Sequence, residues 1–184
     1  MKILVLGMGN DLYGDDGVGI HAVRILKAQW PARKRRGGLM SDVDFEECAL
    51  SGIALLDVIG GYDALVIIDT ITKPRPVTGR IRVLEASAFR DVPGPSPHYV
   101  SVPQTMDIGR QLGLKIPRQL KVVAVEAKDI YHLGEGLSPR MKAALPGIVN
   151  RAKKILRDLE IQADPERTPA DAPRRSPLLS TKSL

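Results

Sequence analysis

The stretch that decides the fold is residues 3–23, ILVLGMGNDLYGDDGVGIHAV. An apolar run ends at glycines, two adjacent carboxylates follow at Asp15 and Asp16, and apolar residues then recur at helical spacing. This pattern predicts a buried strand over residues 2–7, a glycine-rich turn and a helix over residues 16–30. The polar residues that interrupt the run, and the lack of a small-residue cleavage site after it, favour a first strand over a signal peptide.

The rest of the chain alternates between predicted strands and predicted helices. Further strands are expected at residues 43–50, 64–68, 79–87 and 120–128, and further helices at residues 52–59, 101–112 and 139–160. The alternation predicts a three-layer α/β/α fold, in which a twisted, mostly parallel sheet of five strands carries helices on both faces. Residues 1–163 are expected to form a single domain. Residues 164–184, rich in proline and polar residues without periodicity, are expected to form a disordered tail.

Composition and charge narrow the functional classes. The single cysteine, Cys48, excludes an internal disulfide framework and a cysteine-rich zinc site, and it favours a reducing, cytoplasmic location. No apolar run approaches the roughly 20 residues that span a bilayer, so no membrane partner is expected. Five positive charges of the net +6 lie together without an acid, so the rest of the chain is nearly neutral: Lys27, Arg33, Lys34, Arg35 and Arg36. Because aromatic residues make up only 4%, a solvated basic loop is expected there rather than a nucleic-acid surface.

The glycine-rich turn admits more than one interpretation. A dinucleotide fingerprint needs a third glycine where Leu12 stands, and a P-loop needs a Gly-Lys-Ser/Thr sequence that is missing. A phosphate would also share the helix N-terminus with Asp15 and Asp16, which disfavours nucleotide binding but leaves it as an alternative. One aspartate is explained as a helix cap, but two in succession cannot both cap, so the second is available to a cleft.

Two further candidates follow other predicted strands. Asp69 ends the most continuously apolar run, and His98 lies between prolines in the loop after the fourth strand. Since the carboxyl ends of parallel strands meet at one edge, Asp16, Asp69 and His98 are expected to converge there. Two oxygen ligands and one nitrogen ligand suit a borderline divalent ion. Weaker candidates are His21, at the margin of an apolar helix face, and His132 with Glu126.

Four motifs, in order and with matching separation, resemble those of the hydrogenase maturation endopeptidases: ILVLGMGNDLYGDDGVG, ALVIIDT, SPHYVSVPQTM and GLSP. The resemblance runs from residue 1 to about residue 159. It implies an endopeptidase that removes the C-terminal extension of a nickel-loaded hydrogenase large-subunit precursor. It also implies that Asp16, Asp69 and His98 contact nickel that the substrate supplies and the protease does not hold permanently. Asp16 and Asp69 are the candidate catalytic carboxylates.

The resemblance leaves the chemistry open. Either a carboxylate activates water, or the nickel polarises the scissile carbonyl as a Lewis acid. One departure is CALSG at residues 48–52, where the family commonly has a glycine-rich D-G-G turn; only Gly52 is kept. Cys48 is expected to be buried and not a nucleophile. A non-cleaving, nickel-dependent maturation chaperone is the main functional alternative, and a monomer is expected.

Overall fold

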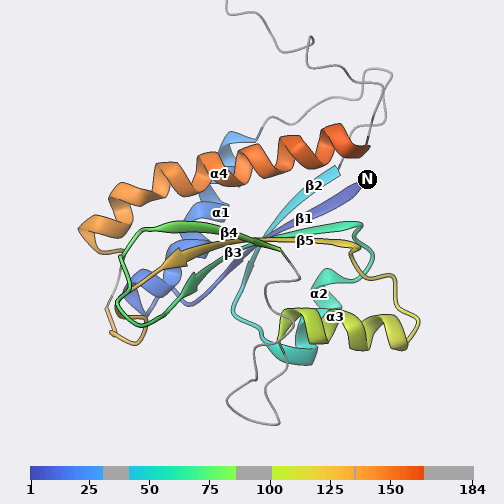
Figure 1. Cartoon of the computed structure of the whole chain (residues 1–184), viewed down its shortest axis with the longest axis horizontal. Coiled ribbons are helices and arrows are strands. Elements are labelled where there is room, and N and C mark those ends of the chain that lie inside the picture. Colours follow the sequence, from blue (N-terminus) through green and yellow to red (C-terminus); the bar gives the residue numbers. More distant parts are fainter. Residues whose placement is uncertain (31–41, 86–100, 135, 164–184) are drawn as a thin grey trace, which may run out of the picture.

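A five-stranded sheet with the order β2-β1-β3-β5-β4 forms the centre of the computed structural model, which describes residues 1–30, 42–85, 101–134 and 136–163. The strands are β1 (Lys2–Met8), β2 (Asp42–Cys48), β3 (Ala64–Ile71), β4 (Ile81–Glu85) and β5 (Gln119–Glu126). All pair in parallel except β4, which runs antiparallel to β5 at one edge. The strands fan out in Figure 1, as expected for a twisted sheet, and the predicted mostly parallel topology is confirmed.

Helices cover both faces of the sheet (Figure 1), which confirms the three-layer arrangement. Successive side chains of a strand point to opposite faces, so each central strand contributes to two cores. One core joins the sheet to α1 (Val18–Gln29) and α4 (Pro139–Ala163), and its strand residues include Ile3, Val5, Val66, Ile68, Val123 and Val125. The other joins it to α2 (Leu55–Ile59) and α3 (Val102–Gln111) through Leu4, Leu6, Leu65, Ile67, Val122 and Ala124.

The helix starts follow local capping signals. Ser101 and Gln104 form a reciprocal capping box at the start of α3, where the side chain of each accepts a backbone N–H of the other. The Ser138 hydroxyl accepts the backbone N–H of Met141 at 3.3 Å and so caps α4. In both helices a Ser is followed by Pro in the first turn, which is a local sequence signal for a helix start.

Among the element boundaries that differ from the predictions, two bear on the site. Residues Gly14–Gly17 form a 3-10 turn, η1, so α1 begins at Val18 and not at Asp16. β3 continues past Asp69 to Ile71, because β5 offers a paired partner as far as Glu126. Asp69 therefore lies within the last residues of a strand, which fixes the direction of its side chain.

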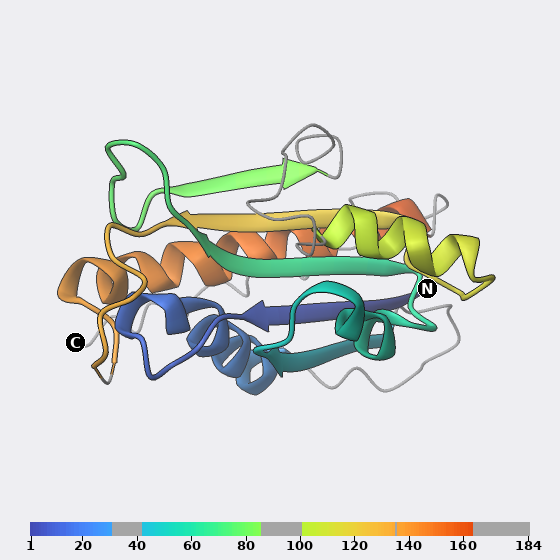
Figure 2. The same cartoon turned by 90° about the horizontal axis from the view of Figure 1, so that it is seen from below.

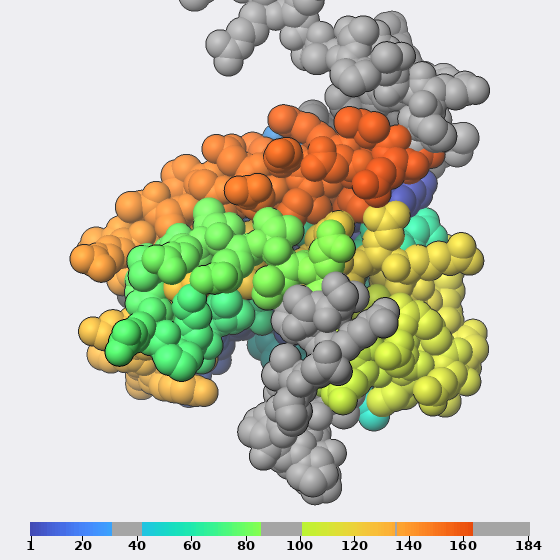
Figure 3. Space-filling model, viewed as in Figure 1, coloured from blue at the N-terminus to red at the C-terminus, as the bar shows by residue number. Residues whose placement is uncertain are grey.

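The face seen in Figure 3 is formed largely by α4 and by the segment that leads into β4, which lie side by side. Val83 of β4 and Ile155 of α4 line a common cavity there, and Ile81 packs against the core beneath α4. None of the helices in the described part of the chain is both long and apolar enough to cross a membrane. The basic cluster at residues 33–36 and the expected tail at residues 164–184 lie outside the described residues.

Candidate active site

The order in which the chain adds strands to the sheet reverses between β1 and β3. From β1 the chain goes to β2 on one side, whereas β3, β5 and β4 lie in that spatial order on the other side. Ligands of open α/β sheets bind at such a point, outside the carboxyl ends of the strands. A cavity of about 270 Å³ lies there, lined by Met8, Gly9, Asn10, Asp16, Cys48, Ala49, Leu50, Ser51 and Asp69. Figure 2 shows that the segments following β1, β2 and β5 emerge at this end of the sheet.

Asp16 is held in the cavity by two hydrogen bonds. Its Oδ2 accepts the backbone N–H of Asn10 at 2.9 Å, and its Oδ1 accepts the Thr70 hydroxyl at 2.8 Å. The turn that makes this possible needs glycine at position 9, where φ is +126° and an added Cβ would lie 2.0 Å from the Asp16 carbonyl oxygen. Part of the glycine-rich sequence therefore serves to bring Asp16 back against β1.

Asp15, unlike Asp16, forms its hydrogen bonds away from the cavity. Its carboxylate accepts two hydrogen bonds from Ser138, one from the backbone N–H at 2.7 Å and one from the hydroxyl at 2.9 Å. Asp15 thus fastens η1 to the start of α4, 123 residues later in the chain. The paired aspartates divide into one that anchors the fold and one that lines the cavity.

Asp69 approaches the same cavity from β3. Its Oδ1 accepts the backbone N–H of Thr70 at 2.7 Å. Burial raises the pKa of Asp69 to about 6, and the charge of Asp16 acts in the same direction, while the Thr70 N–H opposes both. A carboxyl group with such a pKa exchanges protons near neutral pH, and a bound cation would stabilise its charged form.

Thr70 joins the two carboxylates and was not predicted from the sequence. Its hydroxyl donates to Asp16 while its backbone N–H donates to Asp69. The alternation of β3 could have revealed it: Ile68 packs in the core beneath α1, so Thr70 points to that same side, where the segment carrying Asp16 begins. Thr70 is itself buried, with 9% of its surface exposed, so its hydroxyl has little competition from water.

The other candidates have structural surroundings. Cys48 is buried, as expected; it lines the cavity, and its Sγ accepts the backbone N–H of Leu50 at 3.4 Å. His132 is exposed in the segment after β5, and His21 is partly buried on α1. His98 lies outside the described residues, so its predicted place beside Asp16 and Asp69 stays a prediction. Within the described ranges, no group of three or more His, Cys, Asp or Glu side chains could hold a metal ion.

Glu126, at the end of β5, is an anchor for the loop between β3 and β4. Its carboxylate is fully buried and pairs with Lys73 and Arg82, each at 2.8 Å, and it accepts the backbone N–H of Val77 at 2.9 Å. Burial alone would raise the pKa of Glu126, but the hydrogen bonds from Lys73, Val77 and Arg82 outweigh it and lower the pKa to about 2. Glu126 is therefore engaged in holding this loop.

Several known proteins are similar to this chain in sequence and in fold. The chain is 27% identical over 185 residues to the hydrogenase expression/formation protein HupD of Thiocapsa roseopersicina, a match that covers all of this chain and 79% of the relative. It is 26% identical over 172 residues to the hydrogenase 2 maturation protease of Escherichia coli, covering 90% of this chain and 96% of the relative. Among solved structures, the hydrogenase maturating endopeptidase HybD from Escherichia coli superposes with a TM-score of 0.66 at 25% identity, covering 86% of this chain and 94% of that one. No protein-family model matches the chain.

These similarities extend over the segments that build the cavity, because the match to HupD spans the whole chain. They also agree with the four motifs that the sequence shares with one family. By sequence and by fold, the chain is similar to hydrogenase maturation proteases over most of its length.

Proposed function

We propose that the protein cleaves the C-terminal extension from a nickel-loaded hydrogenase large-subunit precursor and that it recognises the substrate through its nickel. The observation that carries this proposal is the pair Asp16 and Asp69, joined through Thr70 in one cavity at the carboxyl edge of the sheet. The names of the relatives supply the reaction class, since they include a hydrogenase 2 maturation protease and a hydrogenase maturating endopeptidase.

The charge of the cavity supports recognition of a cation. Burial raises the pKa of Asp69 most, and the charge of Asp16 raises it further, so the two carboxylates repel each other when both are ionised. A divalent ion carried by the substrate would remove this repulsion and bind both groups as oxygen ligands, with His98 as the proposed nitrogen ligand. Docking would then depend on prior metal insertion, and a precursor without nickel would be bound weakly.

The same pair can perform the hydrolysis. In the proposed step, ionised Asp69 removes a proton from water as the water oxygen attacks the scissile carbonyl, and the proton then passes to the departing amine as the C–N bond breaks. Asp16, held by Asn10 and Thr70, orients the cation. Alternatively, the nickel of the substrate polarises the scissile carbonyl and the carboxylates serve only to bind the ion.

Intact mass spectrometry of the precursor tests the function directly. The large subunit, prepared with and without nickel, is incubated with the wild-type protein, with Asp16→Asn, with Asp69→Asn and with Asp57→Asn. Asp57 is an exposed carboxylate in α2 and serves as the charge-matched control. We expect shortening of nickel-loaded precursor by the wild type and Asp57→Asn, and none by the two cavity variants.

Each contrary result has a definite meaning. Equal shortening of precursor with and without nickel would refute recognition through the metal. Unimpaired cleavage by both Asp16→Asn and Asp69→Asn would refute the assignment of the site. Nickel-dependent binding without any shortening would identify the protein as a maturation chaperone that inspects the precursor and leaves it intact.

A further inference from the structure

Exposed apolar side chains gather on both sides of the cavity. In the described part of the chain, six of the eleven large hydrophobic side chains exposed to solvent lie in the segments that follow β1, β2 and β5, at the same edge of the sheet as the carboxylates: Leu12, Tyr13, Leu50, Ile53, Tyr131 and Leu133. We call these six residues the apolar rim. Tyr131 and Leu133 are 82% and 71% exposed, which is costly for side chains of this size unless something covers them.

One side of the apolar rim is built from two loops that brace each other. The backbone N–H of Gly134 donates to the Leu12 carbonyl at 3.0 Å, and the N–H of Gly14 donates to the Gly134 carbonyl at 2.9 Å. These bonds hold Leu12 and Tyr13 beside Leu133, although more than 100 residues separate them in the chain. Figure 2 shows the two loops side by side at this end of the sheet.

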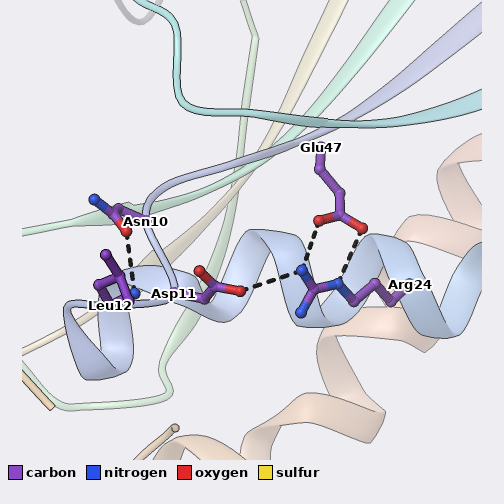
Figure 4. A network of polar contacts seen from close by, with 5 residues as sticks. All are labelled: Asn10, Asp11, Leu12, Arg24 and Glu47. Carbon is purple, nitrogen blue, oxygen red and sulfur yellow. Dashed lines mark hydrogen bonds and ion pairs between the residues drawn. The ribbon is translucent and has the colours of Figure 1, made fainter. Parts of the chain in front are cut away.

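Local hydrogen bonds also fix the backbone that carries these apolar side chains. Asp129 Oδ1 accepts the backbone N–H groups of Tyr131 at 2.9 Å and His132 at 3.1 Å. The Leu12 N–H donates to Asn10 Oδ1 at 3.0 Å, as Figure 4 shows. Because the backbone is already ordered, a partner that covers these side chains has less conformational entropy to remove.

The other side of the rim follows β2. Leu50 lines the cavity itself, and its N–H donates to Cys48 Sγ. Ile53, 57% exposed, follows three residues later in the short turn before α2. The two carboxylates of the cavity thus have exposed apolar side chains on either side.

Nearby acidic groups outside the cavity are already paired. Arg24 on α1 donates to Glu47 Oε2 at 2.7 Å and to Asp11 Oδ2 at 3.2 Å, so one guanidinium holds the acid after β1 and the acid on β2 (Figure 4). Asp15 is engaged by Ser138. Asp16 and Asp69 are the two carboxylates in the lining of the cavity, and an occupant that suits this edge has positive charge at its centre and apolar groups around it.

We propose that the apolar rim is the docking surface for the polypeptide substrate, and that it binds apolar side chains on both sides of the cation-bearing segment. This inference rests on the proposed function for the identity of the substrate. The cation supplies positive charge that neutralises Asp16 and Asp69. The apolar rim adds affinity, because binding removes apolar surface from water. Recognition therefore has two parts: the carboxylates of the cavity bind the metal, and the apolar rim binds the polypeptide around it.

Steady-state cleavage kinetics with nickel-loaded precursor separate the two parts. The rim variant Tyr131→Ser/Leu133→Ser is compared with Leu112→Ser/Leu114→Ser, a control that removes two exposed leucines from the loop before β5, at the opposite edge of the sheet. We expect the rim variant to raise KM by about tenfold with kcat changed by less than about twofold, and the control to match the wild type. Ile53→Ser, on the other side of the cavity, is expected to raise KM as well.

Binding of the same precursor, measured by biolayer interferometry, distinguishes failure of the rim from failure of the proposed function. If the wild type cleaves and all rim variants keep its KM, the rim proposal is wrong and the proposed function stands. If the wild type binds without cleaving and the rim variants bind about tenfold more weakly, the rim proposal stands and peptidase activity is refuted. A loss of affinity in the control variant as large as in the rim variants would also overturn the proposal, because affinity would not then depend on this edge.

Discussion

Replacement of Asp69 by asparagine is expected to make the protein more stable at neutral pH and at the same time inactive. Asparagine keeps an oxygen that can accept the Thr70 N–H and removes the negative charge that the cavity disfavours. The activity is lost because a neutral amide neither takes a proton from water nor neutralises a cation. Stability given up at a functional group in this way is common in enzymes.

The magnitude follows from the pKa of Asp69. Burial and the charge of Asp16 raise this pKa from 3.8 to about 6, which corresponds to about 3 kcal/mol of stability, since a tenfold change in proton affinity is worth about 1.36 kcal/mol. A folded-state pKa above the unfolded value means that the folded protein keeps the proton that the unfolded chain has already lost. The wild type therefore loses this stability as pH rises from about 4 to about 6, and Asp69→Asn does not.

Urea denaturation at half-unit steps between pH 4 and pH 8, with a chelator present, measures the difference. The free energy of unfolding of Asp69→Asn should equal that of the wild type near pH 4 and exceed it by up to about 3 kcal/mol above pH 6. Asp63→Asn is the matched control with the opposite sign. Hydrogen bonds from the Lys2 N–H and from Lys115 lower the pKa of Asp63, so its removal should weaken the protein at neutral pH. Parallel pH profiles of Asp69→Asn and the wild type would refute the claim that the cavity destabilises this carboxylate.

Three further outcomes are expected from the other polar contacts. Asp15→Asn weakens the attachment to Ser138 and should lower the free energy of unfolding, measured in urea, by about 1–3 kcal/mol, while kcat on nickel-loaded precursor is unchanged. A loss of kcat without a loss of stability would contradict the anchoring role of Asp15. Thr70→Val removes the donor to Asp16 and should lower kcat by about tenfold, whereas Thr70→Ser restores it; equal rates for the two variants would argue against positioning by the hydroxyl. Glu126 has a pKa lowered to about 2, so its contribution to stability is present above pH 4.5 and is lost as pH falls towards 2. The melting temperatures of Glu126→Gln and the wild type should therefore differ at pH 7 and converge near pH 2. A difference that stays constant with pH would contradict this.

Much of the fold could be predicted because its signals are local. The apolar run of β3 identifies a strand buried on both faces, and the alternation of Ile81 and Val83 marks β4 as an edge strand. The caps at Ser101 and Ser138 depend on residues within one helical turn. Patterns of this length are set by backbone geometry and by which side of an element meets water, so one sequence suffices to read them.

The boundaries near the site were wrong for a reason that is not local. The predicted helix start at Asp16 becomes a 3-10 turn, because Gly14 pairs with Gly134 from the loop after β5. Gly19 also meets the backbone of two strands: an added Cβ would lie 2.3 Å from the carbonyl oxygens of Met8 and Ile68. The sequence shows glycines at these positions but not which distant segment requires them.

The sequence alone determined the alternation of strands and helices, the parallel sheet and the segments that carry carboxylates to its carboxyl edge. Only the tertiary structure decided which of two adjacent aspartates lines the cavity, because Asp15 accepts a hydrogen bond from Ser138, 123 residues away in the chain. It likewise placed Thr70 between Asp16 and Asp69 and raised the pKa of Asp69. Hydrogen bonds and desolvation depend on which atoms lie within a few ångströms in space, and the order of residues along the chain does not specify those distances.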